Sequence, residues 1–175
     1  MKAADRDVYW DTVSYGSWTF YLAATEKGLC RITLPHENLS ALEQWVQKHL
    51  SPREWLHEPR ALAPYTAQIR EYLEGNRTSF SLALDLEGTP FQMRVWQALQ
   101  EIPYGTLRSY AEIAATIGRP TASRAVGRAI GSNPIPLVIP CHRVIGKDGT
   151  LTGYRGGLPM KVALLKHEGI ACGLQ

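Results

Sequence analysis

Residues 133–146 read Asn-Pro-Ile-Pro-Leu-Val-Ile-Pro-Cys-His-Arg-Val-Ile-Gly, and they govern how the second half of this 175-residue chain folds. The prolines at positions 134, 136 and 140 exclude a helix, because proline lacks the backbone donor and clashes with the preceding turn. We therefore predict a rigid, buried, extended segment. It ends by presenting Cys141, His142 and Arg143 in succession.

Short helices are predicted on both sides of this segment. Thr89 is a candidate N-cap for a helix that starts at Pro90, because proline suits the first helical position. Residues 109–116 and 121–131 predict two more short helices with a glycine-containing turn between them, which is a helix-turn-helix candidate. After the segment, residues 160–168 predict the last helix.

The first half of the chain predicts strands as well as helices. Runs rich in aromatic and β-branched residues indicate three short strands, at residues 8–13, 17–23 and 29–34. Ser40 is predicted to cap a helix over 41–50, and a second helix is predicted over 64–73. Residues 80–86 alternate between apolar and other residues and predict a further strand, and the pattern breaks at Glu87.

These elements predict an α+β protein with two domains. Residues 1–88 form a small sheet with helices, and residues 89–175 form a helical domain that carries the helix-turn-helix motif.

The composition excludes several classes of protein. Hydrophobic residues make up 45% and charged residues 20%, which is typical of a globular chain. No stretch approaches the ~18 consecutive apolar residues of a membrane span. The N-terminus is rich in acidic residues and lacks the apolar region of a secretory signal. The three cysteines, Cys30, Cys141 and Cys172, do not describe a disulfide framework. We expect reduced thiols, no metal site, no membrane association, and a cytoplasmic location (nuclear in a eukaryote).

Charge is distributed unevenly along the chain. Residues 1–90 carry nine Lys/Arg and twelve Asp/Glu, a net charge of −3, whereas residues 91–168 carry ten and four, a net charge of +6. A basic half favours a polyanionic partner, of which nucleic acid is the commonest. A basic face that is merely solvated is the alternative.

Cys141 is the candidate nucleophile. A thiolate needs a base to take its proton and a positive field to hold its charge, and both lower the pKa of a thiol. His142 and the Arg-rich half offer both, so we expect a lowered pKa. Neighbouring side chains on an extended segment point to opposite sides, so His142 would act through a bridging water. Glu168 is the candidate to orient the imidazole, and Asn133 the candidate to fix the segment. A buried, inert cysteine is the alternative.

The segment Pro140-Cys141-His142-Arg143-Val144 resembles the active-site signature of the O6-alkylguanine-DNA alkyltransferases. The resemblance covers residues 89–170 in the family's order. It includes the motifs Phe91-Gln92-Met93-Arg94-Val95-Trp96-Gln97-Ala98-Leu99, Ile102-Pro103-Tyr104-Gly105, Ser109-Tyr110, Arg124-Ala125-Val126-Gly127, Asn133-Pro134, Gly153-Tyr154-Arg155-Gly156-Gly157 and His167-Glu168-Gly169. The first half matches only in general layout, which in the family is a ribonuclease H-like domain.

The resemblance implies direct reversal of DNA damage. Cys141 takes the alkyl group from O6 of guanine, or from O4 of thymine, and Glu168, His142 and a water generate its thiolate. Tyr110 donates a hydrogen bond or proton toward guanine N3. No cofactor takes part and nothing regenerates the thiol, so each molecule reacts once.

The resemblance also implies how DNA is bound. The target atom is inaccessible in a stacked duplex, so the base must be flipped out. Arg124 matches the family's intercalating arginine, on a recognition helix that enters the minor groove of double-stranded DNA. The small neighbours that allow close approach, and a second arginine, are Ala122, Ser123, Ala125, Gly127 and Arg128. A monomer suffices for this chemistry, and clustering of several copies on DNA stays open.

The base pocket implied by the resemblance consists of Pro136, Val144, Tyr154, Arg155 and Gly156. Arg155 stands where some family members have a small residue, which leaves the tolerated size of the alkyl group open.

Two other functions compete with alkyl transfer. A lesion-binding protein without chemistry would keep the helix-turn-helix but lack the cysteine. A thiol hydrolase would use Cys141 and His142 on an ester or amide, and would leave the Arg-rich helix unexplained.

Overall fold

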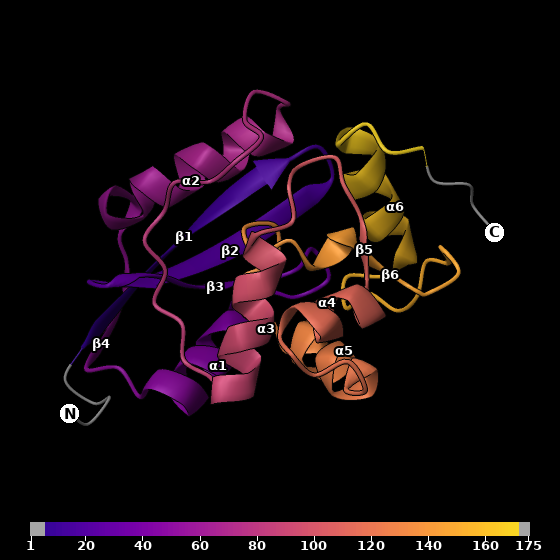
Figure 1. The fold of residues 1–175 in the computed structure, drawn as a ribbon. Helices are drawn as coiled ribbons and strands as arrows, with labels where there is room; N and C mark the ends of the chain where they lie inside the picture. The colour runs from indigo at the N-terminus through magenta and orange to yellow at the C-terminus, as the bar shows by residue number, and fades with distance from the viewer. Residues whose placement is uncertain (1–5, 172–175) are drawn as a thin grey trace. The chain divides into compact units, whose positions relative to one another are not determined.

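A computed structural model describes residues 6–171, and it divides the chain into two compact units (Figure 1). One unit ends at Leu86 and the other begins at Glu87, close to the boundary predicted from the sequence. Cys172 lies outside the described residues. None of the helices within residues 6–171 has the length and apolarity that a membrane span requires.

The first unit is a four-stranded sheet with two helices. Its strands follow the order β3-β2-β1-β4, with antiparallel pairing among the first three and parallel pairing of β4 with β1. The strands are β1 (Asp7–Tyr15), β2 (Trp18–Thr25), β3 (Gly28–Ile32) and β4 (Glu54–His57). The helices are α1 (Leu39–Leu50) and α2 (Pro59–Leu73). Leu42, Val46 and Leu50 of α1 pack on Val8 and Ala23 of the sheet, and α2 lies on the other side of the sheet in Figure 1.

The two helices of this unit begin earlier than predicted. Asn38, not Ser40, caps α1, because its extended backbone lets the side-chain oxygen accept from the amide of Ala41 at 2.9 Å. α2 begins at Pro59 and continues through Pro64, where the sequence pattern predicts its start. A proline at the first position satisfies the helix start better, since the amides of the first turn have no intrahelical partner.

The predicted strand over residues 80–86 is wrong, and β4 was missed. Residues 80–84 keep the alternating burial of a strand, but residues 80–86 form only one bridge, between Leu84 and Leu29. The side chain of Gln68 bonds both backbone groups of Ser81, at 3.0 and 3.2 Å, and so replaces a neighbouring strand. Gly28 lets the segment approach, because a Cβ there would lie 2.4 Å from the carbonyl oxygen of Ala83. β4 is short and largely exposed, so it carries little apolar pattern.

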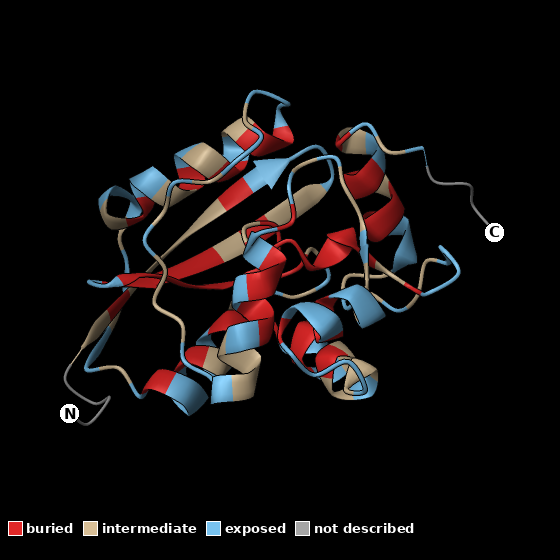
Figure 2. Cartoon of the chain, viewed as in Figure 1, coloured by how far each residue is buried: buried red, intermediate tan, exposed pale blue. Residues whose placement is uncertain are grey.

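The second unit is mainly helical. Its helices are α3 (Pro90–Gln100), α4 (Tyr110–Thr116), α5 (Ser123–Gly131) and α6 (Leu158–His167), with a 3₁₀ turn, η2 (Cys141–Arg143). The strands β5 (Arg108–Ser109) and β6 (Val144–Ile145) pair in parallel. Thr89 caps α3 in a reciprocal capping box with Gln92, as its sequence predicts. Figure 2 shows the buried residues concentrated on the inner faces of these helices and along residues 133–146. The α+β class is confirmed.

Residues 133–146 are buried as predicted, but the prediction of an extended segment is wrong. The chain turns at Leu137, whose φ of 73° is left-handed, and the amide of Ile139 donates to the carbonyl of Ile135 at 2.9 Å. It then closes into the 3₁₀ turn at Cys141. Prolines exclude a helix but are compatible with successive tight turns, and the sequence pattern does not separate these from an extended chain. α5 likewise begins at Ser123, two residues later than predicted.

Candidate active site

Asn133 anchors the turns that lead to Cys141. Its side chain, 1% exposed, accepts from the amide of Ile135 at 2.9 Å and donates to the carbonyl of Ile139 at 2.8 Å. Two buried backbone groups that no helix or sheet satisfies therefore have partners. One side chain spans the whole bend and holds it in a single shape.

Cys141 begins the 3₁₀ turn and is buried, with its amide bonded to the carbonyl of Ile139. The expectation of a lowered thiol pKa is wrong. Burial raises the pKa of Cys141 above its ordinary value, because desolvation disfavours the thiolate. A hydrogen bond from Asn133 and the charges of Arg155 and Lys161 act in the opposite direction and offset part of this. The thiol is therefore protonated at rest, within a positive field that favours its anion.

His142 and Glu168 form a buried pair. The imidazole Nε2 lies 2.6 Å from a carboxylate oxygen of Glu168, and both side chains are 0% exposed. Burial lowers the pKa of His142, against the opposing effect of Glu168, so the imidazole is neutral and able to accept a proton. We expected the side chains of Cys141 and His142 to point to opposite sides of an extended segment. Because η2 is a 3₁₀ turn, they are instead related by a rotation of about 120° about its axis.

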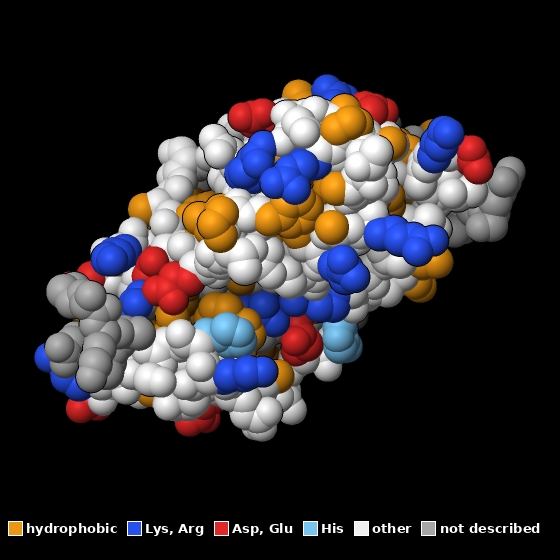
Figure 3. Space-filling model, turned by 60° about the horizontal axis from the view of Figure 1, so that its bottom comes forward, with side chains coloured by type: hydrophobic (Ala, Val, Ile, Leu, Met, Phe, Trp, Pro, Cys, Tyr) orange, Lys and Arg blue, Asp and Glu red, His pale blue; other side chains and the backbone are white. Residues whose placement is uncertain are grey.

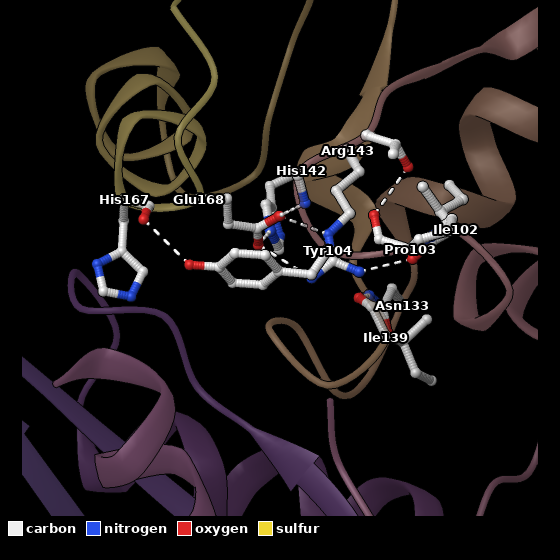
Figure 4. Close-up of polar contacts among 11 residues, drawn as sticks. Ile102, Pro103, Tyr104, Asn133, Ile139, His142, Arg143, His167 and Glu168 are labelled. Atoms are coloured by element: carbon white, nitrogen blue, oxygen red, sulfur yellow. Dashed lines mark hydrogen bonds and ion pairs between the residues drawn. The ribbon is translucent and has the colours of Figure 1, made fainter. Parts of the chain in front are cut away.

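Arg143 completes the surroundings of Glu168 and was missed as a site residue (Figure 4). Its guanidinium donates to both carboxylate oxygens, at 2.8 and 3.0 Å, and to the carbonyl of Ile102 at 2.7 Å. The amide of Gly105 donates to the same carboxylate at 3.1 Å. A two-point bond to a guanidinium is among the strongest that a carboxylate makes, so Glu168 is held as an oriented anion. In the sequence, only the position of Arg143 next to His142 could have marked it as a site residue.

Lys161, on α6, is a second site residue that the sequence did not predict. It is 1% exposed, and its ammonium donates to the carbonyls of Val144 at 2.5 Å and Thr152 at 3.2 Å. Its charge lowers the pKa of both Cys141 and His142. A lysine near a predicted helix end is normally exposed, so nothing local in the sequence marks it.

Tyr110 is placed by the pairing of β5 with β6. Ser109, immediately before it, pairs with Ile145, so the start of α4 lies beside the chain that leaves η2. The phenol oxygen accepts from the hydroxyl of Thr152 at 3.1 Å.

The predicted pocket residues differ in burial. Pro136 and Val144 are buried, Tyr154 and Gly156 are half-buried, and Arg155 is exposed. The hydroxyl of Tyr154 is buried, and its pKa lies well above the ordinary value because of desolvation and the nearby Cys141. The structure thus brings Tyr154 to the thiol.

α5 presents a different surface. Arg124 and Arg128 are exposed, whereas Val126, Ala129 and Ile130 of the same helix are buried. The small residues expected to allow close approach, namely Ala122, Ser123, Ala125 and Gly127, are half-buried. The face in Figure 3 carries Lys and Arg side chains in several places among hydrophobic ones. The two arginines are not part of the buried cluster.

These features define a class of protein: two units, the second of which carries a thiol on a buried turn beside a histidine–carboxylate pair. Sequence models of one family match both units. Residues 8–86 match the ribonuclease-like domain of 6-O-methylguanine DNA methyltransferase, and residues 90–170 match its DNA binding domain. The chain belongs to this family, and the resemblance drawn from its motifs is confirmed.

Similar proteins cover most of the chain. The inducible methylated-DNA–protein-cysteine methyltransferase of Bacillus subtilis (strain 168) is 45% identical over 96% of this chain and 94% of its own length. A methylated-DNA–protein-cysteine methyltransferase of Mycolicibacterium paratuberculosis is 57% identical over 65% of this chain and 69% of its own. The crystal structure of Mycobacterium tuberculosis OGT in complex with DNA has a TM-score of 0.79 and 42% identity, over 91% of this chain and 92% of that one.

Proposed function

We propose that this protein repairs alkylated DNA by moving a methyl or larger alkyl group from O6 of guanine to Sγ of Cys141. The observation that carries the proposal is the buried turn itself, in which the thiol is followed directly by a histidine bonded to Glu168 at 2.6 Å. The relatives named above are methylated-DNA–protein-cysteine methyltransferases, and one related structure contains DNA. O4 of thymine offers the same kind of leaving group.

The first step is loss of the thiol proton. Burial keeps Cys141 protonated at rest, and the neutral His142 accepts its proton through a bridging water. Glu168, held by Arg143, stabilises the resulting imidazolium. Lys161 and Arg155 then favour the thiolate. A buried cation such as Lys161 stabilises a thiolate more strongly than an exposed one, because the effective dielectric constant is lower in the interior.

The second step is a displacement at carbon. The sulfur–carbon bond forms as the carbon–oxygen bond breaks, and the guanine leaves with the electron pair of that bond. Tyr110 donates a hydrogen bond to the departing base, which then takes up the proton that His142 held. No tetrahedral intermediate forms, so no oxyanion hole is needed. The product is a thioether, which no group in the site hydrolyses, so the protein acts once.

DNA reaches the site through α5. Its exposed Arg124 enters the minor groove and fills the space that a flipped base leaves, while Arg128 contacts phosphate. The half-buried small residues of α5 let its backbone approach the duplex. Pro136, Val144, Tyr154, Arg155 and Gly156 surround the flipped base. Such a protein works where DNA is, which in a bacterium is the nucleoid within the cytoplasm.

Mass spectrometry tests this proposal directly. Mixing the protein with a duplex that contains O6-methylguanine should add one methyl group to the peptide that contains Cys141, with one lesion removed per protein molecule. Complete removal of the lesion beside an unmodified Cys141 contradicts the proposal.

A Cys141→Ala variant separates the three candidate functions. Under alkyl transfer it binds the alkylated duplex as tightly as the wild type but repairs nothing. A lesion-binding protein would lose nothing by the change, because the wild type would not repair either. A hydrolase would lose turnover on an ester and show no affinity for the duplex at physiological salt.

A further inference from the structure

Two parts of the second unit hold the phenol of Tyr110. On one side α5 packs close to the ring, since a Cβ added at Gly127 would lie 3.8 Å from a ring carbon. On the other side the hydroxyl of Thr152 donates to the phenol oxygen at 3.1 Å. Thr152 lies 42 residues further along the chain, in the loop between β6 and α6. The phenol oxygen is thus fixed by a loop that the sequence pattern did not connect with it.

Thr152 also connects this loop to the turn of the nucleophile. Its carbonyl accepts from the ammonium of Lys161, which in turn donates to the carbonyl of Val144. Val144 directly follows η2. The side chain of Thr152 therefore bonds Tyr110, while its backbone is tied through Lys161 to Val144, three residues after Cys141.

The direction of the first bond has a chemical consequence. A phenol has a single proton to donate, and its oxygen accepts. Because Thr152 supplies the proton of this bond, the proton of Tyr110 stays available for another acceptor. A phenol oxygen that already accepts a hydrogen bond is also a better donor, because bonds in a chain polarise one another.

We propose that Thr152 is a positioning residue for alkyl transfer: it orients the hydroxyl of Tyr110 toward the departing base and strengthens its hydrogen bond. The inference rests on the proposed function of Tyr110. Thr152 does not touch the reacting atoms, and it acts only through the phenol. Its side-chain hydroxyl, and not its backbone carbonyl, carries this role.

Single-turnover repair of a duplex with one O6-methylguanine tests the inference. Thr152→Val removes the hydroxyl but keeps the shape of the side chain. It also keeps the backbone carbonyl that accepts from Lys161. The rate at saturating protein should fall about 10-fold, the effect of one hydrogen bond, while the dissociation constant of the duplex stays within about 2-fold. Thr152→Ser keeps the hydroxyl and should repair at nearly the wild-type rate. A Thr152→Val variant as fast as the wild type overturns the inference, and so does a Thr152→Ser variant as slow as Thr152→Val.

A double-mutant cycle shows whether Thr152 acts through Tyr110. In a Tyr110→Phe background there is no phenol oxygen to orient, so Thr152→Val should slow repair no further. An equal slowing in both backgrounds overturns the inference while leaving the proposed function intact. A Tyr110→Phe variant that repairs at the wild-type rate removes Tyr110 from the proposed function and overturns the inference with it. Methylation of Cys141 in the same samples reports separately on alkyl transfer.

Discussion

The two units place their charges differently. In the first unit the ion pairs Arg53–Asp7, His57–Asp11 and Arg77–Glu71 have a partner that is well exposed, and Arg31, at 7% exposed and over the ring of Trp45, is the one buried charged residue among those described. In the second unit four ionisable residues, His142, Arg143, Lys161 and Glu168, are each at most 5% exposed. A buried charge is tolerated only where it is fully paired. The first unit therefore resembles an ordinary stable fold. In the second unit the buried ionisable groups of the site reduce the stability of the fold.

The largest expected difference concerns the carboxylate of Glu168. Glu168→Gln leaves the guanidinium of Arg143 buried without its counter-charge, and this should lower the free energy of unfolding by about 3–5 kcal/mol. Glu71→Gln is the matched control in the first unit, where the exposed pair with Arg77 should contribute no more than about 1 kcal/mol. Urea unfolding measures both. Equal losses would remove the contrast between the two units.

Asn133 and Asn38 offer a second matched pair. Asn133→Ala leaves the amide of Ile135 and the carbonyl of Ile139 buried without partners and should cost about 2–4 kcal/mol. Asn38→Ala removes an exposed helix cap and should cost about 1 kcal/mol. The same urea titrations decide, and repair should slow only in Asn133→Ala. If Cys141 is methylated at the wild-type rate in Asn133→Ala, the turn holds its shape without the asparagine.

Acid should weaken the second unit before the first. Burial lowers the pKa of His142 below its ordinary value of 6.5. Just below pH 6.5 the imidazole is therefore protonated in the unfolded chain but still neutral in the folded chain, which favours unfolding. The stability that this group contributes is present above pH 6.5 and falls as the pH drops below that value.

The acid response of the first unit is expected at lower pH. Arg53 lowers the pKa of Asp7, whose ordinary value is 3.8, so the stability from that pair is present above 3.8 and is lost as the pH falls further. Amide hydrogen exchange at pH 7 and 5 should show weaker protection at the lower pH in η2 and α6 but not in β1. Parallel weakening in both units would contradict this order.

The smallest effects on the free energy of unfolding are expected from substitution of the exposed arginines of α5. Arg124→Ala and Arg128→Ala should leave the free energy of unfolding nearly unchanged, because both side chains are exposed. Arg128→Ala removes the proposed phosphate contact and should reduce the slope of log affinity against log salt by about 1. Arg70→Ala, an exposed arginine on α2, is the matched control and should leave that slope unchanged. Fluorescence anisotropy with a labelled duplex across a salt series measures all three.

Local signals predicted the elements of the fold well where a cap or a periodic apolar stripe was present. Thr89 and Gln92 show this for α3, since capping involves only residues within one turn of each other. The same signals failed for residues 80–86, which bridge β3 only at Leu84 and bond the side chain of Gln68 at Ser81 instead of continuing as a strand. They also failed for residues 133–146, because prolines exclude a helix without choosing among the remaining conformations.

The sequence by itself determined the family and the order of the helices in the second unit, and it predicted Cys141 as the nucleophile with His142 and Glu168 as its companions. Tertiary structure alone decided the protonation of the site: burial raises the pKa of Cys141, and Arg143 and Lys161 become buried cations around it. The reason is physical. Residue types and capping act over a few neighbours, whereas desolvation and charge depend on every atom that the fold brings near, as when Glu168 meets the amide of Gly105.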